Sequence, residues 1–277
     1  MDIIGWKYYN HAAVPVTAPH EEVNIVPIRN KTIWKMDGRP IMARWTSNFD
    51  CGYETSWYYV IKDSEFDIQQ LKSKRRYEIK KGEKFFDVKR VEANEYIYEI
   101  YKVRKDFFNA NGIRIEDFSV FKNRTLDWGK YIIYCAFLKD TDEVCGYARI
   151  EDRESYYDFM NLTVNPKYEN KAINAAIVSG ILKNINDDLA KGKYICDGSK
   201  NIFHRTNFQH YLEKYFMFRK AYCKLNVEYP TYIKVTVALL KPFKKIIKSM
   251  SDNSIRMGQL TAVLEMDRIS KECKSCE

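Results

Sequence analysis

Residues 131–138 read YIIYCAFL, residues 144–150 read VCGYARI and residues 156–164 read YYDFMNLTV. Each run is apolar, rich in β-branched and aromatic residues, and long enough for one strand. The polar segment KDTDE separates the first two runs, which predicts a hairpin connection. Asn165-Pro166 ends the third run, because proline has no N–H group to donate to a strand ladder. The stretch therefore predicts three consecutive antiparallel strands.

A segment with helical periodicity follows, from about residue 172 to residue 189. Its apolar positions recur at three- and four-residue spacing and are Ile173, Ala176, Ile177, Gly180, Ile181 and Ile185. A short strand is expected at 194–196, then a helix at about 206–215 and a last strand at about 220–227. The predicted order is three antiparallel strands, a helix, a strand, a helix and a strand.

This order, together with Leu162-x-Val164-x-Pro166-x-Tyr168 and the segment LEKYFMF at 212–218, resembles the GNAT acyltransferase superfamily. The resemblance implies an α/β (α+β) fold with a mixed, mostly antiparallel central sheet flanked by helices. It also implies acetyl-CoA or another acyl-CoA as co-substrate, held by the strand, the loop after it and the next helix. The matching positions are Leu162, Thr163, Val164, Asn170, Lys171, Ala172, Ile173 and Asn174.

In the superfamily this loop carries a Gln or Arg followed by glycines, and its backbone N–H groups hold the coenzyme pyrophosphate. The corresponding residues here read ENKAIN, from Glu169 to Asn174. The acid opposes the charge of a pyrophosphate, and Cβ atoms replace the glycines that permit close backbone approach. Lys171 could compensate for the acid. The sequence therefore matches the superfamily better in fold than in its coenzyme loop.

The chemistry implied by the resemblance is direct attack of an amine on a thioester held between two diverging strands. It requires a base for the amine and an acid for the leaving thiolate. Tyr211 is the candidate acid, although the superfamily's tyrosine position falls on Leu212. Asp197, at the end of the 194–196 strand, and Asp158, inside the third apolar run, are the candidate bases. A turn or helix-capping role explains Asp197 about equally well.

A helix is also expected from about residue 66 to residue 81, ended by Gly82. Its polar face carries Lys72, Lys74, Arg75, Arg76, Lys80 and Lys81, and such a charge run usually marks a solvated face. However, RRYEIKKG at 75–82, followed by a strand at 85–91, resembles the linker into the second GNAT-like half of Fem-type peptidyl transferases. Those proteins use aminoacyl-tRNA or related donors, so this resemblance implies tRNA as an alternative partner.

We expect four regions along the chain. Residues 1–64 form an N-terminal, strand-containing extension or a truncated GNAT-like half. Residues 65–83 are the basic linker helix, residues 84–228 the GNAT-like acyltransferase domain, and residues 229–277 a C-terminal helical appendage. Trp45 and Trp57, on two early strands, could line a site, but such residues more often close a small core, which we favour.

The totals describe a globular chain with 45% hydrophobic and 30% charged residues. A net charge of +9 permits nucleic acid, an anionic membrane surface or an acidic substrate as partner. Seven scattered cysteines, several inside apolar runs, predict free thiols and a cytoplasmic location, and Cys273 and Cys276 lie in a polar end segment. No apolar run is long enough to span a membrane. We expect no metal, since His204 and His210 lack the spacing of a helical metal pair.

Residues 232–250 combine an apolar stripe with lysines and no acidic residue. The stripe contains Leu239, Leu240, Phe243, Ile246, Ile247 and Met250. A helix of this kind can make peripheral contact with an anionic bilayer surface. The alternative, which we favour, is that the stripe packs on the sheet or on a partner subunit.

Three functions are consistent with the sequence. The first is an acyltransferase, of N-acetyltransferase type, that moves an acyl group from acyl-CoA to an amine. The acceptor would be a small molecule, a sugar or other glycan precursor, or an amino acid. The second is a Fem-like aminoacyl transferase that uses charged tRNA, and the third is a non-catalytic GNAT fold kept as a binding module.

Overall fold

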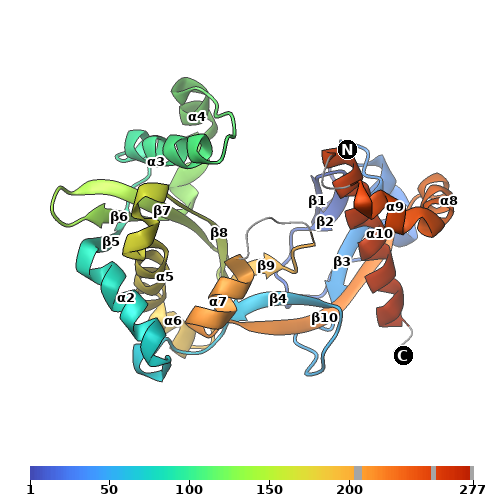
Figure 1. The fold of residues 1–277 in the computed structure, drawn as a ribbon. Helices are drawn as coiled ribbons and strands as arrows, with labels where there is room; N and C mark the ends of the chain where they lie inside the picture. Colours follow the sequence, from blue (N-terminus) through green and yellow to red (C-terminus); the bar gives the residue numbers. More distant parts are fainter. Residues whose placement is uncertain (203–207, 251–253, 275–277) are drawn as a thin grey trace. The chain divides into compact units, whose positions relative to one another are not determined.

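The computed structural model describes residues 1–202, 208–250 and 254–274. Figure 1 shows the chain as a ribbon. The chain divides into two compact units. Unit 1 comprises Met1–Val60, Ser199–Asn207 and Lys220–Glu277, and unit 2 comprises Ile61–Gly198 and Phe208–Arg219. His204 and Cys276, two of the residues considered above, lie outside the described residues.

The sheet of unit 2 contains β5 (Phe86–Val91), β6 (Ile132–Leu138), β7 (Glu143–Asp152), β8 (Tyr156–Val164) and β9 (Tyr194–Ser199). These strands lie in the order β9-β8-β7-β6-β5. Neighbours from β5 to β8 pair antiparallel, whereas β8 and β9 pair parallel. The three apolar runs form β6, β7 and β8, so the predicted mixed, mostly antiparallel sheet is confirmed.

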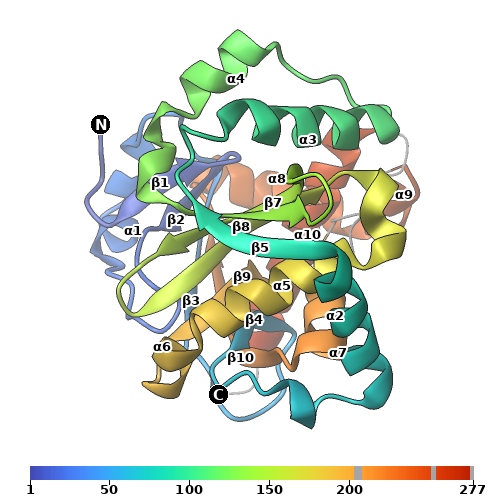
Figure 2. The ribbon, with the colours of Figure 1, turned by 90° about the vertical axis from the view of Figure 1, so that its left-hand side faces the viewer.

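Helices cover both faces of this sheet (Figure 2). On one face, α3 (Ile97–Ala110) and α4 (Phe118–Arg124) place Ile100, Val103 and Phe121 in a core with β6 and β7. On the other, α5 (Ile173–Asn184) packs against β5, β6 and β7, and α2 (Ser73–Phe85) packs along α5. The single helix expected at 172–189 is divided at Ile185 into α5 and α6 (Asn186–Ala190). The last helix of unit 2 is α7 (Phe208–Phe216).

Gly82 does not end the basic helix, so that prediction was wrong. α2 begins at Ser73, later than expected, and continues through a buried Gly82 to Phe85. A Cβ atom at Gly82 would lie 2.6 Å from the carbonyl oxygen of Ala172 and 3.0 Å from Cβ of Ala176. Glycine is needed here because α2 passes very close to the start of α5.

The sheet of unit 1 has the order β1-β2-β3-β10-β4. Its strands are β1 (Trp6–Tyr9), β2 (Ala12–Pro15), β3 (Met42–Ser47), β4 (Trp57–Lys62) and β10 (Arg219–Glu228). β1 and β2 pair antiparallel, β2 and β3 parallel, and β3 and β10 antiparallel. α1 (Val26–Arg29) and a 3₁₀ helix (Thr32–Lys35) lie between β2 and β3 in the sequence. The strand that the sequence predicts at about 220–227, at the end of the expected acyltransferase domain, is β10 and pairs with β3.

The C-terminal segment contains α8 (Thr231–Leu240), α9 (Lys244–Ser249) and α10 (Ile255–Lys274). Met266 and Ile269 of α10 belong to the same core cluster as Trp57 and Leu225 of the sheet. The segment expected as an appendage therefore supplies part of the core of unit 1. Among the described residues, no helix has the length and apolar character needed to cross a membrane.

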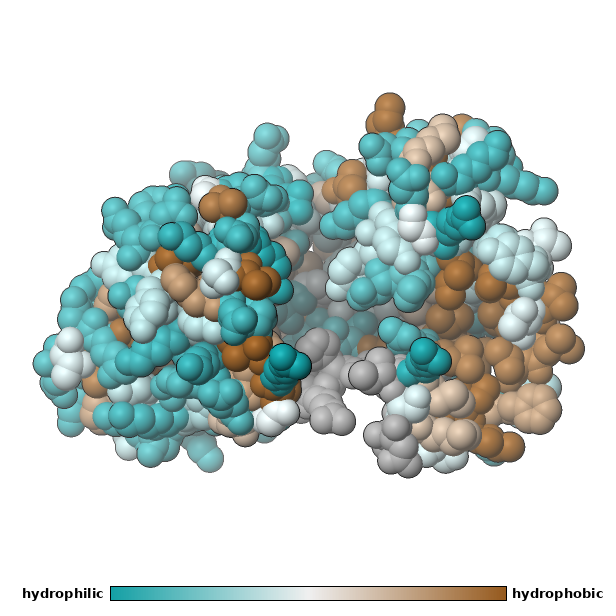
Figure 3. All heavy atoms as spheres, turned by 90° about the horizontal axis from the view of Figure 1, so that it is seen from above, coloured by the Kyte–Doolittle hydropathy of each residue, from teal (hydrophilic) through white to brown (hydrophobic). Residues whose placement is uncertain are grey.

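α8 and α9 present a continuous apolar stripe to solvent, and a hydrophobic patch is visible on the right-hand side of Figure 3. Its residues recur every three or four positions and are Tyr232, Val235, Leu239, Phe243, Ile246 and Met250, each at least half exposed. Val237 and Ile247 face the other way and pack on Leu264 of α10. Of the six residues predicted to share one side, Ile247 is buried, Leu240 is partly buried and the other four are exposed.

Candidate transfer site

β8 and β9 pair over three residues of each strand and then part. The register joins Tyr156 to Tyr194, Tyr157 to Ile195 and Asp158 to Cys196. Beyond Asp158, β8 continues to Val164 and pairs with β7 on its other edge. Within the described ranges no strand pairs with this edge of β8 after Asp158.

Asp158 and Asp197 lie where the two strands part. Desolvation raises the pKa of the Asp197 carboxyl to about 8, and the charge of Asp158 adds to this rise. A hydrogen bond from the side chain of Gln209 opposes it. The same side chain donates from Nε2 to the backbone carbonyl of Asp197 at 3.4 Å. Two neighbouring carboxyl groups of this kind can hold one proton between them at neutral pH, so that one accepts a proton while the other carries one.

Tyr211 of α7 lies in a column of aromatic rings. Phe159 of β8 meets Phe208 edge-on with ring centroids 5.5 Å apart, and Phe208 stacks on Tyr211 at 5.9 Å. Tyr211 in turn stacks on Tyr215 at 4.8 Å. The guanidinium of Arg75, from α2, lies 3.3 Å from the centre of the Tyr215 ring. The column therefore joins β8, α7 and α2.

Burial raises the pKa of the Tyr211 hydroxyl, and the charge of Glu78 raises it further, whereas Arg75 acts in the opposite direction. Tyr211 therefore keeps its proton at neutral pH, as a proton donor must. Among the described residues no hydrogen bond links Tyr211 to Asp197. The connection between them is Gln209, which lies on α7 two residues before Tyr211 and contacts Asp197.

The predicted coenzyme loop is a 3₁₀ helix, Pro166–Lys171, followed by α5. Asn165 fixes its start: the side chain accepts from the backbone N–H of Lys167 at 3.0 Å and donates to Asp106 at 2.7 Å. Ala172 then takes a left-handed conformation with φ of 59° and turns the chain into α5. As at every helix start, the first N–H groups of α5 have no intrahelical acceptor.

The start of α5 is nevertheless crowded. Ile173 and Ala175 are buried, and Gly82 packs against the carbonyl of Ala172. The ammonium group of Lys171 lies 4.9 Å from the centre of the Phe85 ring. Oδ1 of Asn174 is buried and accepts no hydrogen bond from the described residues. The Asn174 oxygen can only accept hydrogen bonds, as can the oxygens of a pyrophosphate, so it does not attract that group. The close packing leaves little room for it.

The other predicted donor-binding residues lie on β8 itself. Leu162, Thr163 and Val164 pair with β7, opposite Ala148, Tyr147 and Gly146 respectively. Thr163 and Val164 are buried, and Leu162 is half-buried. These residues therefore present little side-chain surface to a ligand.

Gln209 is a site residue that the sequence did not identify. It is 8% exposed and binds the Asp197 backbone. Nothing distinguishes a glutamine in a short amphipathic helix from a surface residue until the helix is placed against β9. His210, next to it, is exposed.

No protein-family model and no curated protein matches the sequence. Solved structures match by shape. The C-terminal domain (DUF2156) of a protein from Agrobacterium fabrum, assigned as a lysylphosphatidylglycerol synthetase, has 8% identity and a TM-score of 0.50 over 85% of this chain and 82% of its own. L-PGS from Bacillus licheniformis has 11% identity and a TM-score of 0.51 over 85% and 83% of the two chains. FemX has 9% identity and a TM-score of 0.51 over 78% and 81%.

At such low identity these likenesses concern the fold. The three proteins are similar to this chain over most of its length, which includes residues of both units. The resemblance predicted from the sequence, to the GNAT superfamily with Fem-type relatives, is therefore confirmed for the fold.

Proposed function

We propose that the protein transfers an acyl group from an activated ester to an amine, at the point where β8 and β9 part. The observation that carries this proposal is the carboxyl of Asp197, with a pKa of about 8 beside Asp158. The amine nitrogen forms a bond to the acyl carbon while the bond from that carbon to the leaving oxygen breaks. The ionised carboxylate takes the amine proton, and Tyr211 supplies a proton to the leaving oxygen.

The donor that we favour is an aminoacyl ester on tRNA. Crowding at the start of α5 and the acid at Glu169 leave little room for a coenzyme pyrophosphate. Lys74 and Lys80 of α2 and its N-cap residue Lys72 are exposed, and they suit a phosphate backbone. Two of the proteins with a similar fold are named lysylphosphatidylglycerol synthetase and L-PGS. The first name describes a product that carries a lysyl group, which is an aminoacyl group.

Acyl-CoA is the second candidate donor, and the left-handed Ala172 favours it. This residue begins α5 without a side-chain cap, and uncapped N–H groups at a helix start can bind an anion. If CoA binds there, Glu169→Arg removes the opposing charge and tightens binding. Unchanged or weaker affinity in that variant counts against a pyrophosphate at this position.

Calorimetric titration separates the two donors. We expect charged tRNA to bind, with an affinity that falls steeply as salt rises, because phosphate contacts release counterions. A triple variant with Lys72, Lys74 and Lys80 changed to Gln should lower that affinity and flatten the salt dependence. Saturable binding of acetyl-CoA, with no binding of tRNA, would instead establish the second donor.

A further inference from the structure

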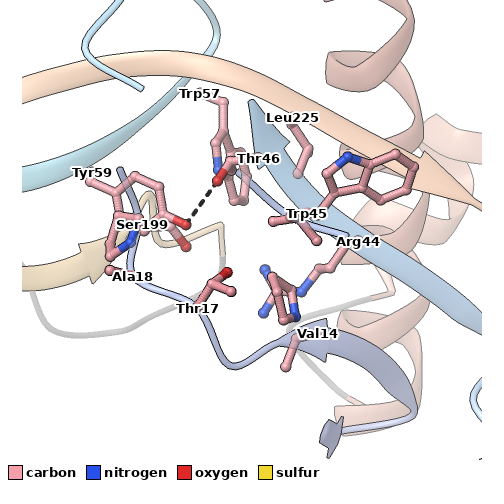
Figure 4. A pocket seen from close by; sticks show the side chains of 13 residues that line it. Val14, Thr17, Ala18, Arg44, Trp45, Thr46, Trp57, Tyr59, Ser199 and Leu225 are labelled. Carbon is pink, nitrogen blue, oxygen red and sulfur yellow. Dashed lines mark hydrogen bonds between the residues drawn. The ribbon is translucent and has the colours of Figure 1, made fainter. Parts of the chain in front are cut away.

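Unit 1 contains a cavity of about 120 Å³ that the proposed transfer does not use. Trp45, Trp57 and Tyr59 form its aromatic walls, and Arg44 and Thr17 reach into the same space (Figure 4). A single water molecule needs about 10 to 15 Å³ of such space, so the cavity is large enough for a small ligand. Trp45 and Trp57, for which we favour a core role on sequence grounds, line this cavity, and Trp57 also belongs to the sheet core.

Arg44 is the one charged side chain among the described residues that line the cavity. Within the described ranges its guanidinium makes neither an ion pair nor a hydrogen bond. Burial lowers the pKa of Arg44, and the groups that oppose this are the hydroxyls of Tyr59 and Tyr9 rather than a carboxylate. A desolvated cation without an anion is costly, and a bound anion removes that cost.

Two further polar atoms beside the cavity have no partner. Oγ1 of Thr17 and Nε1 of Trp57 are buried and make no hydrogen bond with the described residues. Trp57 is 2% exposed, so bulk water does not satisfy its N–H group. By contrast, the hydroxyl groups of Thr46 and Tyr59 form a hydrogen bond with each other, with the two oxygens 3.2 Å apart. Indole and guanidinium groups only donate, so a ligand that satisfies both must present acceptor oxygens.

We propose that this cavity binds the oxyanion group, a carboxylate or a phosphate, of a small molecule. Arg44 is its charged partner, and the Trp57 N–H and the Thr17 hydroxyl supply two more hydrogen bonds. The rings of Trp45 and Tyr59 contact the apolar part of the ligand. The site is built by unit 1 alone, and none of the transfer-site residues Asp158, Asp197 and Tyr211 lines it.

The test follows the indole N–H signal of Trp57 by NMR, identified by its loss in Trp57→Phe. Sodium acetate and inorganic phosphate are titrated separately at constant ionic strength, with acetamide as the neutral analogue of acetate. We expect one of the two anions to move the signal saturably and acetamide to leave it unchanged. The anion that saturates at the lower concentration identifies the ligand as a carboxylate or a phosphate.

Arg44→Met should abolish the shift, and Arg29→Met, which removes an exposed arginine of the same unit, should retain it. Thr17→Val should weaken binding while leaving the ligand-free melting temperature unchanged or higher, because it deletes a hydroxyl without a partner. If Trp57→Phe does not fold, the melting temperature of wild type and of the two arginine variants in each solute gives the same comparison. Failure of both anions to act, or equal action on the Arg44→Met protein, would overturn the proposal.

Discussion

The carboxyl of Asp197 makes the stability of the protein depend on pH. Its pKa is 3.8 as an ordinary aspartate and about 8 in the folded chain. Between these values the folded state binds more protons than the unfolded state, so the free energy of unfolding decreases as pH rises. The contribution of this group is fully present below the lower value and is lost as pH rises through the upper one.

Asp197→Asn should therefore remove this part of the pH dependence. As pH rises from about 5 to about 8, ionisation of this carboxyl should lower the melting temperature of the wild type. The melting temperature of the variant should fall less over the same range. At the alkaline end the variant should be the more stable protein. Asp140→Asn, in the exposed turn between β6 and β7, is the matched control and should keep the wild-type slope. An unchanged slope in Asp197→Asn would show that this carboxyl is not desolvated in the folded state.

Tyr211 and Tyr215 offer a matched pair for the role of the proton donor. They are stacked on the same helix at 4.8 Å, and removal of either hydroxyl leaves the rings in place. Tyr211→Phe should lower turnover by at least about 100-fold, a usual size for loss of a general acid, with little change in melting temperature. Tyr215→Phe should keep most of the activity. Equal rates in both variants, on whichever donor is active, would remove Tyr211 from the site.

At the scale of elements, the contact between α2 and α5 depends on Gly82. Alanine normally stabilises a helix interior by about 1 kcal/mol relative to glycine. Here the added Cβ meets the backbone oxygen of Ala172 at 2.6 Å, and backbone cannot move aside as a side chain can. Gly82→Ala should therefore destabilise the protein by roughly 1 to 3 kcal/mol in chemical denaturation.

Gly129→Ala is the control for this change. Apart from the chain neighbours and the backbone of its own 3₁₀ helix, no atom of the described residues lies within 4 Å of a Cβ atom placed there, so we expect a change within about 0.5 kcal/mol. Equal effects of the two alanines would mean that α2 and α5 do not approach as closely as described.

Ile246 and Ile247 test which face of α9 is packed. Ile247 is 5% exposed and lies against α10, whereas Ile246 is 60% exposed. Ile247→Ala should cost roughly 2 to 5 kcal/mol of unfolding free energy, and Ile246→Ala less than about 0.5 kcal/mol. Urea denaturation of both variants measures this difference directly. Similar losses at both positions would place the two side chains in the same environment.

The exposed stripe on α8 and α9 leaves the predicted membrane contact open to test. If the stripe inserts among lipids, the protein should sediment with anionic vesicles. Binding should weaken as salt rises, because salt screens the attraction between the lysines and the anionic headgroups. Leu239→Ser together with Ile246→Ser, both exposed positions, should then abolish sedimentation without altering the melting temperature. No sedimentation of the wild type at low salt would leave a partner subunit as the occupant of the stripe.

At the scale of the whole molecule, the sequence predicted strands best where a long apolar run is bounded by turn residues. The runs that form β6, β7 and β8 are predominantly apolar, and their alternation with turn residues locates each strand to within two residues. Gly82 was misread because a glycine at a helix end and one at a close helix contact look alike in sequence. The strands β1 and β2 have four residues each, too few for a periodic pattern.

The sequence also predicted part of the candidate site, namely the residues that stand out in a local pattern. Asp158 and Asp197 are conspicuous as acids at a strand and at a strand end, whereas Gln209 gains its role from the placement of α7 against β9. Arg44 and Thr17 meet only because β3 and the segment after β2 lie side by side in unit 1. Contacts between residues distant in sequence have no local pattern, so the sequence did not reveal them.

Removal of the C-terminal helices should destabilise unit 1. Met266 and Ile269 of α10 fill the core formed with Trp57 and Leu225, so truncation after Tyr229 exposes that core to water. We expect the truncated protein to be insoluble or to melt at a markedly lower temperature. A soluble truncated protein with the wild-type melting temperature would show that these helices are an independent appendage.

The most direct test of acyl transfer at this site is the loss of a labelled aminoacyl group from charged tRNA in the presence of a mixture of small amines. The wild type and Asp140→Asn should accelerate this loss equally. Asp197→Asn should be slower by at least about 100-fold, the usual effect of losing a group that takes part in general acid–base catalysis. Labelled acetyl-CoA under the same conditions should be consumed far more slowly than the tRNA ester. Equal rates for Asp197→Asn and the wild type, or no acceleration with either donor, would contradict transfer at the divergence of β8 and β9.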